Sequence, residues 1–261
     1  MSNQELAPIV GVLVTHNSQA FLAELLDSVD GQTQPLDQLI VIDDNSTDST
    51  RNILSERGII AIRSTSTATD LSTRIAGNFL QGVRHAPPGA IVILGDHDDT
   101  WLPNRVEHQS KIMRAFPNAA MLASDGNIKT TDTNRTLRST FPVPANWSAL
   151  SKRQQFTYAL KHSIATGGAS AVRPSRLPAT IPAGWLHDRW WSLAAISKNA
   201  MVLDSEPVIN YRTTPEQQVG LNTQAQHRNT EAWLTHHAKN TGRSIKRSAD
   251  LALLFTGRLN K

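Results

Sequence analysis

Three aspartates follow a short apolar run near the middle of the chain. Ile91–Leu94 is apolar throughout, and Asp96, Asp98 and Asp99 lie within the next five residues. Carboxylates this close repel one another, so they are stable as charged groups only when solvated, hydrogen-bonded or shared by a hard divalent cation. The pattern therefore indicates a buried strand that brings oxygen ligands for Mg²⁺ or Mn²⁺ to the edge of a sheet. The alternative is an acidic turn in which Asp99 or Thr100 caps the next helix.

The same arrangement occurs after two earlier apolar runs. Ile9–Val14 is followed by Thr15, and Leu39–Ile42 is followed by Asp43 and Asp44. Apolar residues at helical spacing separate these runs, and strands that alternate with helices predict a mainly parallel α/β sheet with helices on both faces. The carboxyl ends of parallel strands share one edge, where α/β proteins bind ligands. We therefore expect five side chains to converge there: Thr15, Asp43, Asp44, Asp96 and Asp98.

The composition is that of one globular domain. The 261 residues are 39% hydrophobic and include no cysteine, so the chain can bury a full core and has neither disulfides nor thiolate metal sites. No N-terminal signal and no apolar window of membrane-spanning length occur, which favours a cytoplasmic protein. The formal net charge is +4. A protein that binds nucleic acid would spread basic charge over its fold, whereas most of this excess lies near the C-terminus, so nucleic acid is not an expected partner.

The polar segments at the strand ends, taken in order, resemble the family-2 glycosyltransferases and, within them, the bacterial rhamnosyltransferase-like branch. The resemblance implies an inverting enzyme with a single A-type glycosyltransferase domain, whose Rossmann-like sheet is mainly parallel. Two departures occur: His97 stands where the branch commonly has Gln, and Arg74–Gly77 replaces a glycine-led turn. The matching segments are Thr15-His16-Asn17, Gln32-Thr33, Val41 to Asp48, Asn78-Phe79, Asp96 to Pro103, His187-Asp188, and Tyr211-Arg212 followed by Gln218-Val219-Gly220.

The resemblance also implies roles on the donor side, for a UDP- or dTDP-sugar such as dTDP-L-rhamnose. Asp98 would bind a Mg²⁺ or Mn²⁺ ion that bridges the two phosphates and assists their departure. Asp96 would accept hydrogen bonds from the ribose hydroxyls. Asp44 would receive the N3–H of uracil or thymine, with Thr15 lining the base pocket. Arg74 would pair with a phosphate, and the alternative is an exposed helix arginine.

The general base should come from a later part of the chain, because it must act across the sugar from the leaving group. Asp188 is our candidate. The nearby Trp185, Trp190 and Trp191 would raise its pKa by desolvation and offer aromatic faces to sugar rings. The alternative is that Asp188 caps a helix whose tryptophans are core. His187 would orient Asp188, contact the diphosphate or ligate the metal. A base opposite the leaving group implies a single displacement with inversion at the anomeric carbon.

We expect a catalytic domain of residues 1–223 and a basic helical tail of residues 224–261. Within the domain, residues 1–125 would bind the nucleotide sugar and residues 126–223 the acceptor, a cell-surface polysaccharide or a lipid-linked glycan. The tail has seven Lys or Arg against two Asp or Glu. It could lie as a peripheral contact on the anionic inner face of the plasma membrane. It could equally pack on the catalytic domain or form a homo-oligomer contact.

Two other functions use similar residues. A nucleotidyltransferase also places paired aspartates on an α/β sheet, but it would be expected to show a glycine-rich, basic loop after its first strand, which Thr15–Ser18 lacks. A catalytically silent nucleotide-sugar-binding subunit would keep the donor residues without using Asp188 as a base.

Overall fold

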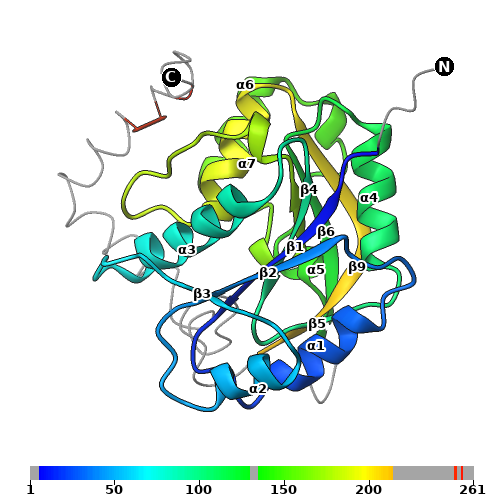
Figure 1. Cartoon of the computed structure of the whole chain (residues 1–261). Coiled ribbons are helices and arrows are strands. Elements are labelled where there is room, and N and C mark those ends of the chain that lie inside the picture. The colour runs from blue at the N-terminus through cyan, green and yellow to red at the C-terminus, as the bar shows by residue number, and fades with distance from the viewer. Residues whose placement is uncertain (1–5, 130–134, 214–249, 252–253, 255–261) are drawn as a thin grey trace.

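The computed structural model of the protein describes residues 6–129, 135–213, 250, 251 and 254. Within these residues nine strands form one sheet in the order β3-β2-β1-β4-β8-β6-β9-β5, with β7 paired to β6 (Figure 1). The strands are β1 (Ile9–Thr15), β2 (Gln38–Asp43), β3 (Ile62–Arg63), β4 (Ile91–Asp96), β5 (Thr100–Trp101), β6 (Met121–Lys129), β7 (Arg135–Thr136), β8 (Ser170–Val172) and β9 (Met201–Arg212).

Helices cover both faces of this sheet (Figure 1). The first strand shows why: Val10, Val12 and Val14 face one hydrophobic core, while Ile9 and Leu13 face a second. A strand buried on both faces needs a continuous apolar sequence, and that is the pattern of β1 and β4. Helices α3, α6 and α7 contribute to the first core, and α1, α2 and α4 to the second. The helices are α1 (Leu22–Asp30), α2 (Thr50–Glu56), α3 (Leu71–His85), α4 (Arg105–Ala115), α5 (Leu137–Thr140), α6 (Lys152–Lys161) and α7 (His187–Ser197).

The predicted α/β fold class is confirmed, and the sheet divides into a parallel and a mixed part. Strands β3, β2, β1 and β4 are parallel neighbours. Beyond β4, the short strand β8 runs antiparallel to both β4 and β6, β9 is parallel to β6, and β5 is antiparallel to β9. Before β8 the chain forms a 3-10 turn, Gly167–Ala169, that leads directly into this strand.

Three described residues from the C-terminal region pack on the rest of the fold. Leu251 and Leu254 contact the first core, and Trp185 Nε1 donates a hydrogen bond to Asp250 Oδ2 at 3.2 Å. These three residues agree with one of the alternatives predicted for the tail, that it packs on the domain. Residues 224–249 lie outside the described residues, and the domain division at 223 remains a prediction. No helix in the described part of the chain has the length and apolar character needed to span a bilayer.

Candidate active site

The side chains predicted to converge start from adjacent strand ends. β1 and β4 pair with Val14 opposite Asp96, and β1 and β2 pair with Thr15 opposite Asp43. The N–H of Asp44 continues the second ladder by donating to the Thr15 carbonyl oxygen at 2.8 Å. The carboxyl edge of the parallel strands therefore carries Asp43 and Asp44 after β2 and Asp96 at the end of β4, with Thr15 at the end of β1 between them.

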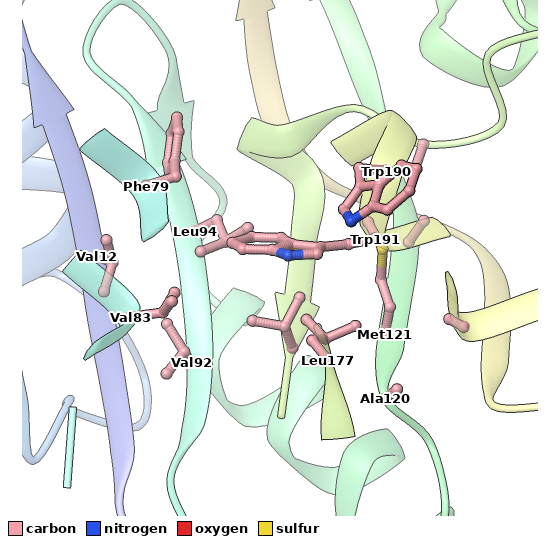
Figure 2. Close-up of a cluster of buried hydrophobic side chains, with 14 of the residues drawn as sticks. Val12, Phe79, Val83, Val92, Leu94, Ala120, Met121, Leu177, Trp190 and Trp191 are labelled. Atoms are coloured by element: carbon pink, nitrogen blue, oxygen red, sulfur yellow. The ribbon is translucent and has the colours of Figure 1, made fainter. Parts of the chain in front are cut away.

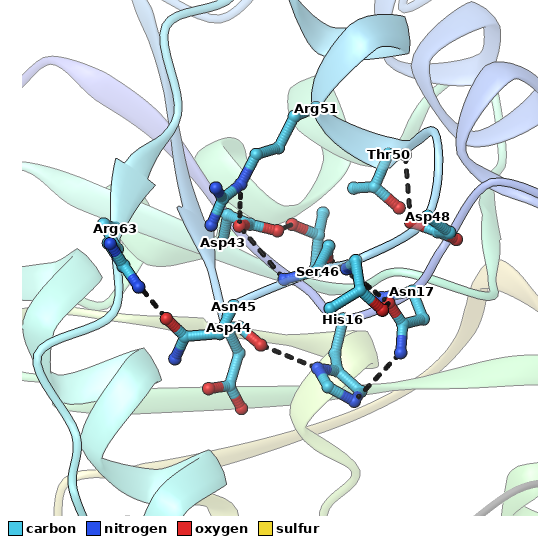
Figure 3. A network of polar contacts seen from close by, with 12 residues as sticks. His16, Asn17, Asp43, Asp44, Asn45, Ser46, Asp48, Thr50, Arg51 and Arg63 are labelled. Carbon is cyan, nitrogen blue, oxygen red and sulfur yellow. Dashed lines mark hydrogen bonds and ion pairs between the residues drawn. The ribbon is translucent and has the colours of Figure 1, made fainter.

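Asp43 holds the turn after β2 (Figure 3). Arg51 Nε lies 2.7 Å from its carboxylate, and the Thr15 hydroxyl and the Ser46 N–H each donate to it at 3.3 Å. Both carboxylate oxygens are thereby occupied, and only a small fraction of the residue is exposed. Asp43 is thus a structural residue, and the turn that it fixes places Asp44 at the rim.

Arg74 on α3 meets Asp44. Its Nε lies 3.0 Å from Asp44 Oδ2, which is an ion-pair distance, although the N–H is not aligned for a hydrogen bond to any described residue. Asp70 fixes the start of α3 by accepting the Thr73 N–H at 2.9 Å. His16 Nδ1 lies 2.7 Å from the main-chain oxygen of Asp44 (Figure 3). The structure thus pairs Arg74 with Asp44, and the pairing of Arg74 with a phosphate stays a prediction.

The carboxylates after β4 lie against the Gly167-Gly168 turn. The Gly168 N–H donates a hydrogen bond to Asp96. A Cβ atom on Gly168 would lie 2.7 Å from Asp96 Oδ2 and 3.0 Å from Asp99 Oδ2, so a side chain there would displace at least one carboxylate. The small residues of this segment therefore allow a close approach of backbone to the acids.

Four carboxylates, which we call the acidic cluster, are close enough for their negative charges to affect one another: Asp96, Asp98, Asp99 and Asp188. The pKa of Asp96 is raised to about 7 by burial and by the negative charges of Asp98 and Asp188. Burial, Asp98 and Asp96 raise the pKa of Asp99 well above its ordinary value. Asp188 comes from α7, much later in the chain, and it nevertheless belongs to the same cluster as Asp96. A divalent cation would relieve this repulsion.

Backbone groups aim the Asp188 carboxylate. The Gly167 N–H donates to Asp188 Oδ2 at 3.3 Å, and the Arg189 N–H donates to Oδ1 at 2.6 Å. The N-cap of α7 is Leu186, so Asp188 does not fill the capping position that was the alternative reading. Two successive N–H groups, those of Gly167 and Gly168, thus hold Asp188 and Asp96 on the two sides of one turn.

His187 is buried without a hydrogen-bond partner for either ring nitrogen among the described residues. Its ring stacks on Phe79 with the centroids 3.9 Å apart, and a Cβ atom on Gly167 would lie 2.4 Å from Nε2. Burial lowers the pKa of His187 to about 4, so the imidazole is neutral at pH 7. His187 does not hydrogen-bond Asp188, which leaves the diphosphate and the metal as its predicted partners.

The tryptophans do not form the predicted sugar-binding surface. Trp190 and Trp191 are almost completely buried in the first core (Figure 2), and Trp185 packs on Trp190 with ring centroids 5.3 Å apart. The prediction of an aromatic sugar platform is therefore wrong for these residues. They support α7 from within the core, which keeps the start of the helix and Asp188 at its place on the rim.

Comparison with known proteins identifies the family. The sequence model of the family described as "Glycosyl transferase family 2" matches residues 12–177, which are more than half of the chain. The chain belongs to glycosyl transferase family 2. It is 28% identical over 126 residues to TuaG of Bacillus subtilis (strain 168), a protein provisionally assigned as a teichuronic acid biosynthesis glycosyltransferase. The match covers 46% of this chain and spans half the length of that relative.

Solved structures show that the fold is shared more widely. S. aureus TarS (residues 1–349, in complex with UDP) superposes with a TM-score of 0.55 at 16% identity, covering 80% of this chain and 61% of that one. Glucosyl-3-phosphoglycerate synthase from Mycobacterium tuberculosis, in complex with Mn²⁺ and UDP-glucose, gives a TM-score of 0.54 at 15% identity, with coverage of 80% and 73%. At these identities the likeness shows the glycosyltransferase A-type fold and nothing finer.

The acidic cluster of this family 2 member fits a divalent cation that shares its coordination with a ligand. No group of three or more His, Asp or Glu side chains among the described residues could hold a metal alone. The mutual repulsion of the carboxylates after β4 nevertheless favours a cation, and Asp98 offers a hard oxygen ligand there. Phosphate oxygens and water would complete the coordination, as is usual for Mg²⁺.

Sequence reasoning missed Arg105. The side chain is fully buried, donates to the Leu94 carbonyl oxygen at 2.6 Å and lies over the Trp101 ring at 4.1 Å from its centroid. Burial lowers the pKa of Arg105 to about 9, and the charges of Asp99 and Asp96 oppose that shift. Arg105 is thus a cation behind the acidic cluster. Nothing in the sequence indicated this burial of Arg105, because an arginine in the first turn of a helix is usually exposed.

Gly168→Ala is expected to lower activity about 10–100-fold, because the new methyl group must move the Asp96 or Asp99 carboxylate. Overpacking of this kind costs about 1–3 kcal/mol of stability. Steady-state kinetics with a thermal melt would measure both effects. Gly77→Ala is the control, since its Cβ would meet nothing closer than Ser66 Oγ at 3.5 Å. Equal activities for the two variants would contradict the assigned role of the turn.

The raised pKa of Asp96 predicts a pH dependence of stability. Between the ordinary value near 4 and about 7 the folded protein holds a proton that the unfolded chain releases. Stability contributed by this site therefore falls as pH rises through this window, by about 1 kcal/mol per pH unit. Asp96→Asn should remove this component, so the variant should gain stability relative to the wild type from pH 4 to 7 without added metal. Urea unfolding at several pH values measures the difference, and a constant difference would contradict the prediction.

Proposed function

We propose that the protein is a metal-dependent, inverting glycosyltransferase that moves a sugar from a UDP- or dTDP-sugar to a cell-surface polysaccharide or lipid-linked acceptor. The observation that carries this proposal is that Asp96 lies near enough to two other carboxylates, Asp98 from its own loop and Asp188 from α7, for their charges to raise its pKa. A metal ligand and a base candidate thus meet at one cluster. TarS in complex with UDP and the mycobacterial synthase in complex with UDP-glucose support a nucleotide-sugar donor, and TuaG, named for teichuronic acid biosynthesis, supports a polysaccharide acceptor.

The nucleoside would lie at the rim formed by β1 and β2. The Asp44 carboxylate would accept the N3–H of uracil or thymine, and Arg74 beside it would donate to a phosphate of the same nucleotide. Thr15 would line this pocket, and Asp96 would accept from the ribose hydroxyls. The pairing of Asp44 with Arg74 at 3.0 Å supports this arrangement, because it sets an acceptor and a donor side by side.

Asp98 would hold Mg²⁺ or Mn²⁺, and this cation would neutralise the negative charge of the leaving diphosphate. Asp188 would take the proton of the acceptor hydroxyl as its oxygen bonds to the anomeric carbon and the bond from that carbon to the phosphate oxygen breaks. The neutral His187 would donate one N–H to the diphosphate or ligate the metal through a free nitrogen. Attack from the side opposite the diphosphate inverts the anomeric centre.

Three narrower proposals follow the same resemblance. The donor sugar is L-rhamnose, as in the rhamnosyltransferase-like branch. The protein acts at the inner face of the plasma membrane, where the basic residues of 224–261 meet anionic lipid. A homo-oligomer contact through the same residues is the alternative use of the tail.

A thermal-shift screen of nucleotides and nucleotide sugars, with and without Mn²⁺, tests the proposal. A true donor stabilises the folded protein by mass action, by about 2.7 kcal/mol at a concentration 100 times its Kd. We expect UDP or dTDP compounds to raise the melting temperature only when Mg²⁺ or Mn²⁺ is present. Stabilisation by purine nucleotides alone, or by none of these compounds, would contradict the proposed function.

A further inference from the structure

The end of β9 meets the loop that carries Asp98. β5 and β9 are antiparallel, with Thr100 opposite Asn210 and Trp101 opposite Ile209. The same register, continued, brings Arg212 opposite Asp98. The last residue of one strand thus lies beside the candidate metal ligand.

Arg212 makes contacts in three directions. Its backbone N–H donates to Asp99 Oδ1 at 2.9 Å, and its Nε donates to the main-chain oxygen of Asp98 at 2.9 Å. A terminal guanidinium nitrogen donates to the carboxylate of Glu24 on α1, and the guanidinium carbon lies 4.8 Å from the centroid of the Phe21 ring. One side chain therefore joins β9, the acidic loop and α1.

The geometry of these contacts matters more than their strength. The side chains of Arg212 and Glu24 are 30% and 54% exposed, and an ion pair this accessible adds little stability. The planar guanidinium, however, fixes the directions of its donors. While Glu24 and Phe21 hold one end of it, Nε stays on the Asp98 carbonyl oxygen and fixes the backbone from which the Asp98 carboxylate projects.

We propose that Arg212 is a positioning residue that holds Asp98 in the orientation needed to bind the divalent cation, with Glu24 and Phe21 holding the guanidinium. The inference rests on the proposed metal role of Asp98. The alternative is that Arg212 only ties α1 to the sheet and stabilises the fold. The two readings differ in one measurable quantity, because only the first changes the apparent affinity for metal.

The test compares four variants of the full chain. Arg212→Met removes both side-chain donors, Arg212→Lys keeps the charge but cannot reach both acceptors in the same plane, and Glu24→Gln weakens the hold on the guanidinium. Arg57→Met is the matched control. Arg57 pairs with Asp27 and Asp30 of α1, the helix that also carries Glu24, but away from the acidic loop. Each protein is titrated with MnCl₂ at a fixed, saturating concentration of UDP or dTDP, whichever stabilises the wild type. The readout is the Mn²⁺ concentration that gives half of the nucleotide-dependent rise in melting temperature.

We expect this Mn²⁺ concentration to rise about tenfold or more for Arg212→Met, by less for Arg212→Lys and Glu24→Gln, and to stay unchanged for Arg57→Met. A lower melting temperature of Arg212→Met with an unchanged Mn²⁺ requirement would overturn the proposal, as would an equal change in the Arg57 variant. If Arg212→Met does not fold, unchanged requirements in the other two variants overturn it. A wild type without any Mn²⁺ dependence would refute the metal role in the proposed function, and this inference with it.

Discussion

Asp188→Asn is expected to lower the rate of sugar transfer by about 10²–10⁴-fold, the usual contribution of a positioned general base. The substitution keeps the shape of the side chain, and the amide oxygen can still accept one of the two N–H groups that the carboxylate accepts, those of Gly167 and Arg189, so the fold and the donor site should persist. It removes the charge that would accept the proton of the acceptor hydroxyl. The measurement is kcat with saturating donor and acceptor, together with the Kd of the donor.

Donor affinity serves as the internal control for this variant. An unchanged Kd with a lost kcat places Asp188 in the chemical step. Transfer at the wild-type rate would show that another group is the base. An intact donor site together with absence of transfer in the wild type, with every acceptor class tried, would instead favour the silent binding subunit.

Asp98→Ala is expected to abolish the metal-dependent part of UDP or dTDP binding. Asp98 is the candidate ligand of the cation, and without it the diphosphate would face Asp96 and Asp99 with no cation held between them. Calorimetric titration of UDP or dTDP with and without Mn²⁺ should show a large effect of the metal in the wild type and almost none in the variant.

Asp30→Ala is a suitable control for the Asp98 experiment, because it removes an exposed carboxylate from α1 outside the cluster. The control should keep the wild-type response to Mn²⁺. Equal nucleotide affinities for Asp98→Ala and the wild type, with and without Mn²⁺, would contradict the metal role.

The parts of the site that could be predicted are those set by strand ends. A parallel strand delivers whatever follows it to one edge of the sheet, so the apolar runs before Thr15, Asp44 and Asp96 were enough to bring these residues together. The fold class followed from the same alternation of strands and helices. The choice of Asp188 relied on the need for a base across the sugar from the leaving group, and in the structure its charge is near enough to raise the pKa of Asp96.

Contacts between distant segments could not be predicted, because they depend on packing. Nothing local to Arg74 shows that its guanidinium reaches Asp44, or that Arg105 is buried behind the acids. The tryptophans near Asp188 were equally compatible with a sugar surface and a core, and only their packing around α7 decides for the core. The Gly167-Gly168 turn likewise meets partners from distant segments, Asp96 at the end of β4 and Asp188 on α7.

The most direct test of the central claim is a crystal structure of the Asp188→Asn variant with Mn²⁺ and a UDP- or dTDP-sugar that binds in the thermal screen. We expect Mn²⁺ to bind Asp98 and the diphosphate, and the base of the nucleotide to lie at Asp44. The anomeric carbon should lie between the diphosphate and residue 188. A nucleotide bound away from β1, β2 and β4, or residue 188 on the same side of the sugar as the diphosphate, would contradict it.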